Sequence, residues 1–378
     1  MIETTALQRL VRFGNGSDYK EVEAEDGPFP VYGSGGQFAR AYRYLYDGES
    51  VLFGRKGTVD RPLYVNGKFW TVDTMYYTVP GPLVESKFLY YWATTIPFDL
   101  YSTNTALPSM TSGTLGRLQF PLLARDKQRR IADYLDRETA TIDALIAKQR
   151  ELIGGLQERR GATIENALTT SGNAIPVKRC ADLLPGYAFP SADFAQGAEG
   201  PLLLRGINVK PRSVNWVEAV SLAPTAEAPS ALYTLRRGDL VLGMDRPFVG
   251  GGTRVAMIDG DSEGSLLVQR VMRLRPTGGT DARMLAYALA GAAFRTQIET
   301  EFTGISVPHL SESQVGRVKI PMPPLDEQRK IADHLDRETV KIDALIAKAE
   351  RFIELGQERR AALITAAVTG QIEIPTED

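Results

Sequence analysis

The stretch QRRIADYLDRETATIDALI at residues 128–146 occurs again, as QRKIADHLDRETVKIDALI, at residues 328–346. The two stretches align without a gap at an offset of 328 − 128 = 200 residues. The same offset relates Gln157-Glu158-Arg159-Arg160 to Gln357-Glu358-Arg359-Arg360. Two unrelated helices would have no reason to share so many polar residues, so we interpret the pair as an internal duplication.

Each copy has the pattern of a long amphipathic helix, with apolar residues at alternating spacings of four and three. The seam is expected to contain Ile131, Leu135, Ile142, Leu145, Leu152 and Leu156 in the first copy and Ile331, Leu335, Ile342, Leu345 and Phe352 in the second. From residue 126 to residue 168 the first helix has about 40 residues and a length of roughly 60 Å. Such a helix needs a partner for its apolar stripe, and the nearest candidate is its own repeat, so we expect the two copies to pair, with Ile142 facing Ile342.

The composition is that of a globular protein in a reducing compartment. The 378 residues allow two or three domains, and the one cysteine cannot form an intrachain disulfide. The first residues lack the basic and apolar regions of a secretory signal, so we expect a cytoplasmic protein. No run of eighteen apolar residues is present, so we expect no membrane contact. Two histidines and one cysteine are too few for a usual zinc cluster.

The pattern along the chain predicts a tandem arrangement of domain, helix, domain and helix. We expect a mixed α/β domain at 1–122, the first long helix at 123–170, a second similar domain at 171–322, and the second long helix with an acidic tail at 323–378. Expected strands include Phe69–Thr78 in the first domain and Leu266–Leu274 in the second, and Met284–Glu299 is expected to be a helix. The two domains are expected to be related, because Gly48–Phe53 parallels Gly238–Gly243.

A block close to EQRxIADxLD opens each long helix, from Lys127-Gln128 to Asp136 and from Glu327-Gln328 to Asp336, after a proline that ends the preceding domain. This arrangement resembles the specificity subunit of type I restriction–modification systems, and the resemblance covers essentially the whole chain. The first copy departs slightly, since it has Ala124-Arg125-Asp126 where the second has Pro324-Leu325-Asp326.

The resemblance implies an α/β (α+β) fold with two similar target recognition domains joined by two long antiparallel coiled-coil helices. Each domain is then expected to read one half of a bipartite site in double-stranded DNA, with the coiled coil setting the spacer. The implied partners are two methyltransferase subunits, which bind S-adenosylmethionine and methylate adenine, and a restriction subunit that translocates DNA. No cofactor is implied for this chain itself.

Three loops of the first domain carry side chains suited to DNA. Tyr32-Gly33-Ser34-Gly35-Gly36-Gln37 offers backbone amides and small side chains for close approach, although a Gly-rich hairpin turn has the same composition. Gly54-Arg55-Lys56-Gly57-Thr58 follows a strand; its arginine can pair with guanine and its lysine with phosphate, or both can be solvated in a surface turn. Asn104 can pair with adenine or can stabilise an ordinary turn.

The second domain offers similar loops. Arg205-Gly206-Ile207-Asn208 follows a strand, and Met244-Asp245-Arg246-Pro247 takes the place of Gly54-Arg55-Lys56. Gln269-Arg270 lies inside an otherwise apolar strand, where the pair either contacts base edges or alternates toward solvent. The loop ending at His309 is a further candidate, although a lone histidine is more often a structural hydrogen bonder.

The candidate DNA contacts are therefore Ser34, Gln37, Arg55, Lys56, Arg61 and Asn104 in the first domain and Arg205, Asn208, Asp245, Arg246, Gln269, Arg270, Ser306 and His309 in the second.

The sequence argues against catalysis by this chain. It has no G-x-x-x-x-G-K-[ST] phosphate loop, so it is not expected to be an ATP-driven motor. Asp245-Arg246-Pro247-Phe248 has arginine where an amino-methyltransferase motif has proline, and Phe13-Gly14-Asn15-Gly16 lacks the spacing of a cofactor loop. The alternatives are a coiled-coil scaffold whose domains bind proteins and a stand-alone methyltransferase. A scaffold would show exposed aromatic or aliphatic anchors in place of basic and amide loops.

Overall fold

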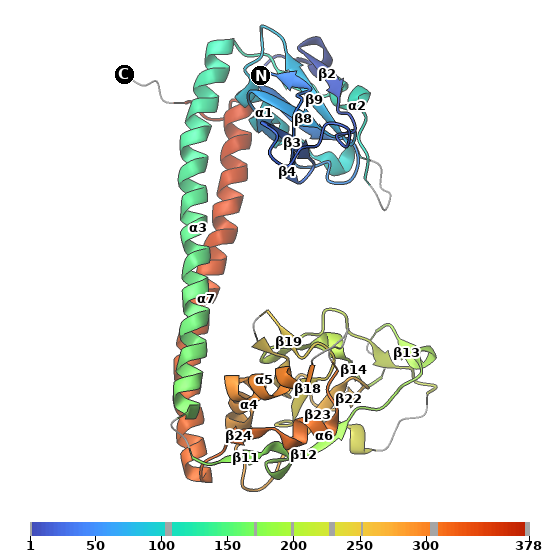
Figure 1. Ribbon diagram of the computed structural model, residues 1–378, viewed down its shortest axis with the longest axis vertical. Helices are drawn as coiled ribbons and strands as arrows, with labels where there is room; N and C mark the ends of the chain where they lie inside the picture. Colours follow the sequence, from blue (N-terminus) through green and yellow to red (C-terminus); the bar gives the residue numbers. More distant parts are fainter. Residues whose placement is uncertain are drawn as a thin grey trace. The chain divides into compact units, whose positions relative to one another are not determined.

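The computed structural model describes residues 2–102, 108–169, 172–197, 200–226, 231–250, 252–302 and 309–374. The chain divides into two compact units. Unit 1 contains residues 1–151 and 349–378, and unit 2 contains residues 152–348. The boundary between the units crosses both long helices, so each unit holds one globular domain and a segment of each helix (Figure 1).

Domain 1, the globular part of unit 1, contains two four-stranded sheets. Its elements are β1 (Thr4–Ala6), a 3-10 turn (Leu7–Arg9), β2 (Val11–Asn15), β3 (Phe29–Gly33), β4 (Gly36–Ala41), β5 (Tyr46–Asp47), β6 (Ser50–Gly54), β7 (Leu63–Val65), β8 (Lys68–Thr71), β9 (Met75–Pro80), α1 (Ser86–Ala93), a 3-10 turn (Phe98–Leu100), α2 (Ser112–Arg117) and β10 (Gln119–Pro121). The strand orders are β2-β9-β6-β7, which is antiparallel throughout, and β4-β3-β8-β5, in which β3 and β8 are parallel.

Domain 2, the globular part of unit 2, repeats the first sheet of domain 1. Its elements are β11 (Ala174–Pro176), β12 (Ala181–Pro185), β13 (Phe194–Ala195), β14 (Leu203–Leu204), β15 (Val209–Lys210), β16 (Ser213–Val214), β17 (Ser221–Leu222), β18 (Leu240–Gly243), β19 (Phe248–Val249), β20 (Gly252–Thr253), β21 (Val255–Met257), β22 (Leu266–Leu267), β23 (Val271–Pro276), α4 (Ala282–Ala290), α5 (Ala292–Glu299), α6 (Glu312–Arg317), β24 (Lys319–Pro321) and 3-10 turns at Val177–Arg179, Ser191–Asp193, Gly206–Asn208, Ala231–Tyr233 and Thr300–Phe302. Its sheet order is β12-β23-β18-β21, and β14 pairs with β22 in parallel, as β3 does with β8.

The central strand of each main sheet is buried on both faces. Alternate residues of a strand point to opposite faces, so an uninterrupted apolar run suits this position. In β6, Val51 and Phe53 belong to the core beneath α1, whereas Leu52 belongs to a second cluster on the other face. In β18 the same division separates Leu240 and Leu242 from Val241. In both domains the central strand therefore contributes to two apolar clusters, one on each face of the sheet.

Several predicted elements are interrupted. The run Phe69–Thr78 forms two strands, β8 and β9, and Leu266–Leu274 likewise belongs to β22 and β23 with Val268–Arg270 between them. The expected helix Met284–Glu299 is two helices, because Gly291 ends α4 and begins α5. The predicted strand position of Gln269 and Arg270 is therefore wrong, and both residues lie in the connection before β23.

The two long helices are α3 (Arg125–Thr169) and α7 (Leu325–Val368), and their segments pair antiparallel within each unit. In unit 1 the Arg360 Nε lies 3.0 Å from the Asp143 Oδ1, and in unit 2 the Arg160 Nη1 lies 2.8 Å from the Asp343 Oδ1. The same ion pair thus occurs in both units with the roles of the two copies exchanged. The prediction of two long antiparallel helices is confirmed. Among the described residues, no helix combines the length and the apolar character of a membrane span.

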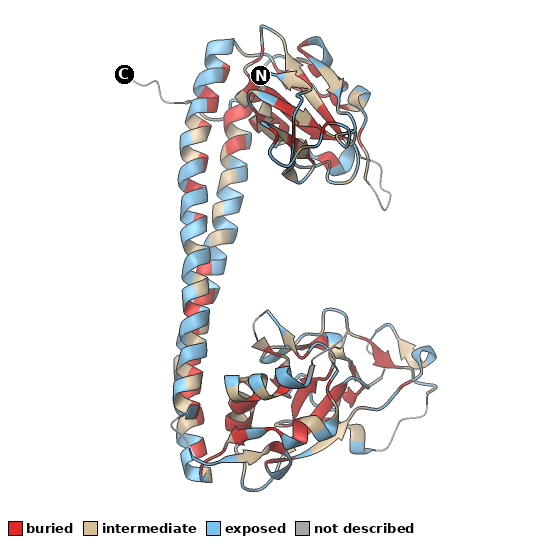
Figure 2. Cartoon of the chain, in the orientation of Figure 1, coloured by how far each residue is buried: buried red, intermediate tan, exposed pale blue. Residues whose placement is uncertain are grey.

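The seam differs from the predicted one at two steps. Ile146 and Ile346 are buried. Thr139 and Thr339 are also buried, and their hydroxyls lie 3.2 Å and 3.1 Å from those of Tyr91 and Tyr287 in the adjoining domains. The side chains predicted instead are about half exposed: Leu145, Leu152, Leu345 and Phe352. Figure 2 shows buried residues at intervals along each long helix, separated by exposed ones. The heptad pattern allowed either Leu145 or Ile146, and either Leu345 or Ile346, to face the other helix. In the structure the isoleucine of each pair is buried.

The predicted contact between Ile142 and Ile342 was also wrong. Ile142 lies beside Gly356 in unit 1, and Ile342 packs with Leu156 and Ile346 in unit 2. The reason is geometric: in an antiparallel pair of repeated helices, equivalent residues meet only at the midpoint of the pair. Residues away from the midpoint face a different part of the other copy.

A buried glutamine attaches each domain to its long helix. Gln128 is fully buried; its Nε2 donates to the carbonyl oxygens of Leu83 (2.9 Å) and Leu123 (2.8 Å), and its Oε1 accepts from the Glu85 N–H (3.0 Å). Gln328 makes the equivalent bonds in unit 2, to the carbonyl oxygens of Gly279 (3.1 Å) and Pro323 (2.7 Å) and from the Asp281 N–H (2.8 Å). Each glutamine therefore hydrogen-bonds three backbone groups, and an apolar side chain at the same position could not replace these bonds.

A second polar contact follows two turns later. In unit 2 the Tyr287 hydroxyl donates to Asp336 (2.8 Å), and Arg283 binds the same carboxylate (2.8 Å). Burial, and then the hydrogen bond to Asp336, raises the pKa of Tyr287 to about 12. Unit 1 has the matching contacts from Tyr91 and Lys87 to Asp136. Each domain is thus fixed to its helix at the same duplicated positions.

We predict that Gln128→Ala destabilises unit 1 by about 2–4 kcal/mol, because three partly buried backbone groups lose their partner. Urea unfolding of the full-length chain, followed by tryptophan fluorescence, measures the effect. The matched control is Gln157→Ala on the exposed face of α3, which is expected to change stability little. Equal unfolding midpoints for the two variants would contradict the proposed role of Gln128.

Candidate nucleic-acid interface

Three backbone segments converge at the end of the central strand in each domain, and we call this place the strand-end junction. In domain 1 the Arg55 N–H donates to Thr74 O (2.8 Å), and Arg55 O accepts from the Met110 N–H (3.0 Å). Lys56 pairs with Ser109 through a single β-bridge. The junction of domain 1 is therefore made of residues 55–57, 74 and 108–110.

The junction of domain 2 has the same hydrogen bonds. The Met244 N–H donates to Arg270 O (2.9 Å), Met244 O accepts from the Leu310 N–H (2.8 Å), and Asp245 forms a β-bridge with His309. The structurally equivalent pairs are Arg55 and Met244, Lys56 and Asp245, Thr74 and Arg270, and Ser109 and His309. The sequence alignment of the two loops was one residue out of register, because Asp245, and not Arg246, occupies the place of Lys56.

The junction of domain 1 is cationic. Arg55 and Lys56 are both exposed, and neither makes an ion pair with any residue that the structure describes. The Arg55 guanidinium lies 5.9 Å from the centroid of the Tyr76 ring. Two free cations on one strand end suit contacts with phosphate or with the acceptor edge of guanine.

The junction of domain 2 holds a cluster of three charged or polar side chains. The Asp245 Oδ1 lies 2.6 Å from the His309 Nδ1 and 3.2 Å from the Arg270 Nη1. The Arg270 Nη1 lies 3.4 Å from the His309 Nδ1. All three side chains remain partly exposed, with 57% exposure for Arg270. The structure thus brings together three residues that are far apart in the sequence and were each predicted separately.

The backbone of this cluster lies in an unusual region. Arg246 has φ 44° and Arg270 has φ 70°, whereas the residue equivalent to Arg246 in domain 1 is Gly57, with φ 82°. A non-glycine residue at positive φ is disfavoured by its Cβ, and such conformations concentrate at functional sites. The chain therefore holds two arginines in a conformation that glycine adopts more easily.

Arg254 supports the cluster from beneath. Its Nη1 donates to Asp245 O (2.7 Å) and its Nε donates to Val209 O (3.0 Å). Burial lowers the pKa of Arg254, although the nearby Asp245 carboxylate opposes this shift. A Cβ at position 243 would lie 3.0 Å from the Arg254 Cζ, so Gly243 allows the close approach. Arg254, which no sequence motif singled out, therefore helps to place Asp245.

The remaining candidates of domain 1 lie at other places. Ser34 is in the turn between β3 and β4, and Gln37 is exposed on β4. Arg61 is exposed in the connection between β6 and β7. Asn104 lies outside the described residues, as Ser306 does in domain 2.

Arg205 and Asn208 have structural partners. Asn208 is 1% exposed; its Oδ1 accepts from the Arg205 N–H (3.0 Å) and its Nδ2 donates to Asn215 O (2.9 Å). The Arg205 guanidinium donates to Glu218 O. The expectation that Asn208 is a surface contact is therefore corrected: its side chain closes a turn. Gln269 is exposed beside Arg270, and its N–H donates to Tyr187 O (2.8 Å).

Sequence reasoning missed Thr74 and Ser109, which belong to the junction of domain 1. The offset of 200 residues relates Ser109 to His309 and could have identified it. Thr74 had no such signal, because the loops of the two domains differ in length. Among the described residues, no group of three His, Cys, Asp or Glu side chains is placed to hold a metal ion.

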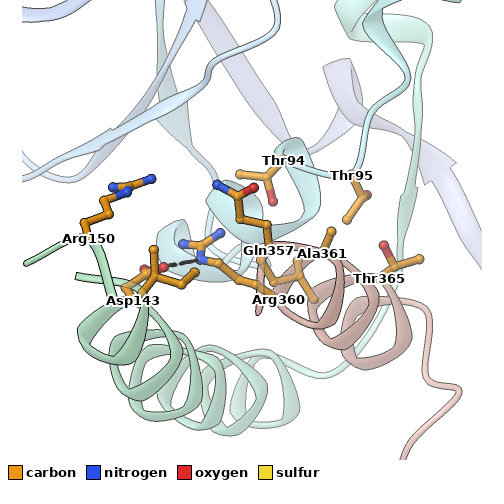
Figure 3. Close-up of a pocket in the computed structure, with 10 residues that line it drawn as sticks. Thr94, Thr95, Asp143, Arg150, Gln357, Arg360, Ala361 and Thr365 are labelled. Atoms are coloured by element: carbon orange, nitrogen blue, oxygen red, sulfur yellow. Dashed lines mark hydrogen bonds and ion pairs between the residues drawn. The ribbon is translucent and has the colours of Figure 1, made fainter. Parts of the chain in front are cut away.

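A pocket of about 450 Å³ lies in unit 1 where the end of α1 meets both long helices. It is lined by Thr94 and Thr95 after α1, by Asp143 and Arg150 of α3, and by Arg360 of α7 (Figure 3). The Arg360 side chain points to Asp143 and is held by it. None of the predicted DNA contacts lines this pocket, so we assign it no part in DNA binding.

Known proteins share a family-specific sequence pattern and the fold of this chain. Residues 8–153 and 215–351 match the family described as the type I restriction modification DNA specificity domain. The MjaVIII specificity subunit of a type I restriction enzyme from Methanocaldococcus jannaschii is 24% identical over 350 residues, which cover 87% of this chain and 78% of that one. The EcoBI specificity subunit of Escherichia coli is 28% identical over 205 residues, 54% of this chain and 40% of that one.

The fold is also found in a solved structure that concerns complex assembly and conformational transition of the type I restriction–modification system. A chain of that structure matches 98% of this chain over 98% of its own length, with a TM-score of 0.73 and 14% identity. Each family match spans globular residues and part of a long helix, so the two matches define a protein with two DNA specificity domains.

The chain belongs to the family of type I restriction–modification DNA specificity subunits. A specificity subunit selects the DNA target and is not itself catalytic, and S-adenosylmethionine belongs to the modification subunit.

Proposed function

We propose that each domain of this specificity subunit reads one half of a bipartite site in double-stranded DNA through its strand-end junction. The observation that carries the proposal is that one backbone junction occurs twice with different side chains. Arg55 and Lys56 line it in domain 1, and Asp245, Arg270 and His309 line it in domain 2. The same backbone structure with different side chains in the two domains suits recognition of two different half-sites.

We also propose that the length of the paired helices sets the gap between the half-sites. Both α3 and α7 are continuous across the boundary between the units. Each domain is fixed to its own helix by a buried glutamine and an aspartate, which supports a fixed geometry within each unit. Lengthening both helices by whole turns is therefore expected to lengthen the gap.

We further propose that two modification subunits bind the outer faces of the long helices. Leu145 and Phe352 are 44% and 43% exposed in unit 1, and Leu345 and Leu152 are 48% and 49% exposed in unit 2. The offset of 200 residues relates Leu145 to Leu345 and Leu152 to Phe352. Each unit thus presents the same pair of apolar positions, which suits two copies of one partner. A restriction subunit is proposed from family membership alone.

The proposed function is tested by single-molecule sequencing of methyladenine in the host genome with and without this gene. We expect a bipartite methyladenine motif that disappears when the gene is deleted and returns on complementation. The experiment gives both half-sites and the gap at once. Persistence of every methyladenine motif after deletion would contradict the proposed role in modification.

We predict that Arg55→Ala weakens binding of the full-length chain to its own site by about 1–3 kcal/mol, because a bidentate contact to guanine is lost. Competition with a duplex whose first half-site is scrambled measures the specific part. Lys56→Ala is expected to weaken binding to all sequences and to reduce the salt dependence by about one phosphate contact. Arg43→Ala, an exposed arginine of the same domain, is the control. A uniform loss for Arg55→Ala on all DNA would make Arg55 a phosphate contact.

We predict that the double variant Leu145→Glu, Phe352→Glu makes the lone chain more soluble and lowers recovery of the modification subunit in co-purification. The charged side chains remove the apolar surface that a partner would cover. Val217→Glu is a matched control, since Val217 is 88% exposed in domain 2 and lies outside both long helices. Unchanged recovery of the modification subunit with the double variant would contradict the docking surface.

A further inference from the structure

The cluster in the junction of domain 2 differs in kind from the surface of domain 1. At the equivalent positions domain 1 has Lys56, Thr74 and Ser109, whereas domain 2 has Asp245, Arg270 and His309. The Asp245 carboxylate balances the charge of Arg270, so this cluster attracts phosphate less than the two cations of domain 1 do. Its geometry therefore favours a role other than general attraction to the DNA backbone.

We propose that Arg270 reads a guanine in the half-site of domain 2 and that Asp245 is the residue that positions it. This inference rests on the proposed function. It assigns guanine recognition to Arg270 and a positioning role to Asp245 in the junction of domain 2. Asp245 engages the Nη1 of Arg270 at 3.2 Å. Within the described residues, the Nε and Nη2 of Arg270 make no hydrogen bond, so this edge is free to donate to the O6 and N7 of guanine.

Three features of the structure hold the arginine for this contact. His309 and Arg270 both contact the same Oδ1 of Asp245, which restricts the carboxylate. Arg254 fixes the Asp245 backbone from beneath. Arg270 has a positive φ, a backbone conformation in which glycine would be less strained. The proposed contact of its side chain with guanine would explain why arginine, and not glycine, occupies this position.

Because Arg270 has a positive φ, comparing its replacement by glycine and by alanine distinguishes base recognition from a structural role. Replacement by glycine removes the side chain and relieves the backbone, whereas replacement by alanine removes the side chain and keeps the strain. A merely structural arginine would lower the melting temperature when lost to either residue. A reading arginine loses base preference in both variants, and the glycine variant melts no lower than the alanine variant.

The experiment uses the full-length chain, alone or in complex with its modification subunits, and selects duplexes from a random-sequence library. The wild type is expected to select a motif with two halves. Arg270→Ala and Arg270→Gly are each expected to reduce the preference for one G·C pair about tenfold or more, in one half-site, while the other half-site is retained. Thermal melting of the same samples provides the structural readout.

Asp245→Asn tests the positioning role. We expect it to weaken the preference at the same G·C pair and to have no further effect on that preference in the Arg270→Ala background, because both changes then act through one contact. Arg237→Ala is the matched control: Arg237 is an exposed arginine that precedes the central strand β18, at the end opposite the junction. It is expected to leave the selected motif unchanged.

Two results would overturn the inference. One is a uniform loss of affinity on all sequences with Arg270→Ala, which would make Arg270 a phosphate contact. The other is an additional loss from Asp245→Asn in the Arg270→Ala background, which would make Asp245 an independent reader. If the wild-type chain selects no two-part motif, the proposed function itself fails, and this outcome is distinct from both.

Discussion

The structure depends on the attachment of each globular domain to a long helix by buried polar contacts. Gln128 and Gln328 each satisfy three partly buried backbone groups where the domain meets its helix. Such groups are costly to leave without a partner, so the bonds specify one orientation of the domain on its helix. Apolar packing alone would allow the domain to slide or turn. The strand-end junction inherits its position within each unit from this attachment.

The duplicated residues are the same in both copies where they make contacts within each unit, and they differ at the exposed junctions. The Arg360–Asp143 and Arg160–Asp343 pairs, the glutamine anchors and the tyrosine bonds to Asp136 and Asp336 all occur twice. At the junctions, however, lysine is replaced by aspartate, threonine by arginine and serine by histidine. An exposed position can change its side chain at little cost in stability, whereas a buried polar position cannot. This difference is consistent with the proposal that the two junctions, with the same backbone structure, recognise different half-sites.

The sequence predicted the long helices well because their signal is periodic and repeated. It predicted the seam less well, since Leu145 and Ile146 are neighbours and either could face the partner helix. The run around Gln269 and Arg270 was read as strand, because apolar β-formers surround it. Nothing in the composition marks Arg270 as a residue at positive φ, which glycine or asparagine usually occupies. The domain boundaries stay a prediction.

The sequence by itself determined that the chain is duplicated, that two long helices pair, and which charged loops are candidates for DNA. These properties are local or repeated, so a linear pattern is sufficient to show them. Tertiary structure alone decided that Asp245, Arg270 and His309 form one cluster, that Asn208 is buried, and that Thr74 and Ser109 belong to the equivalent place in domain 1. Those relations join segments of different sheet strands and loops, and strand pairing across such distances has no signature in the order of residues.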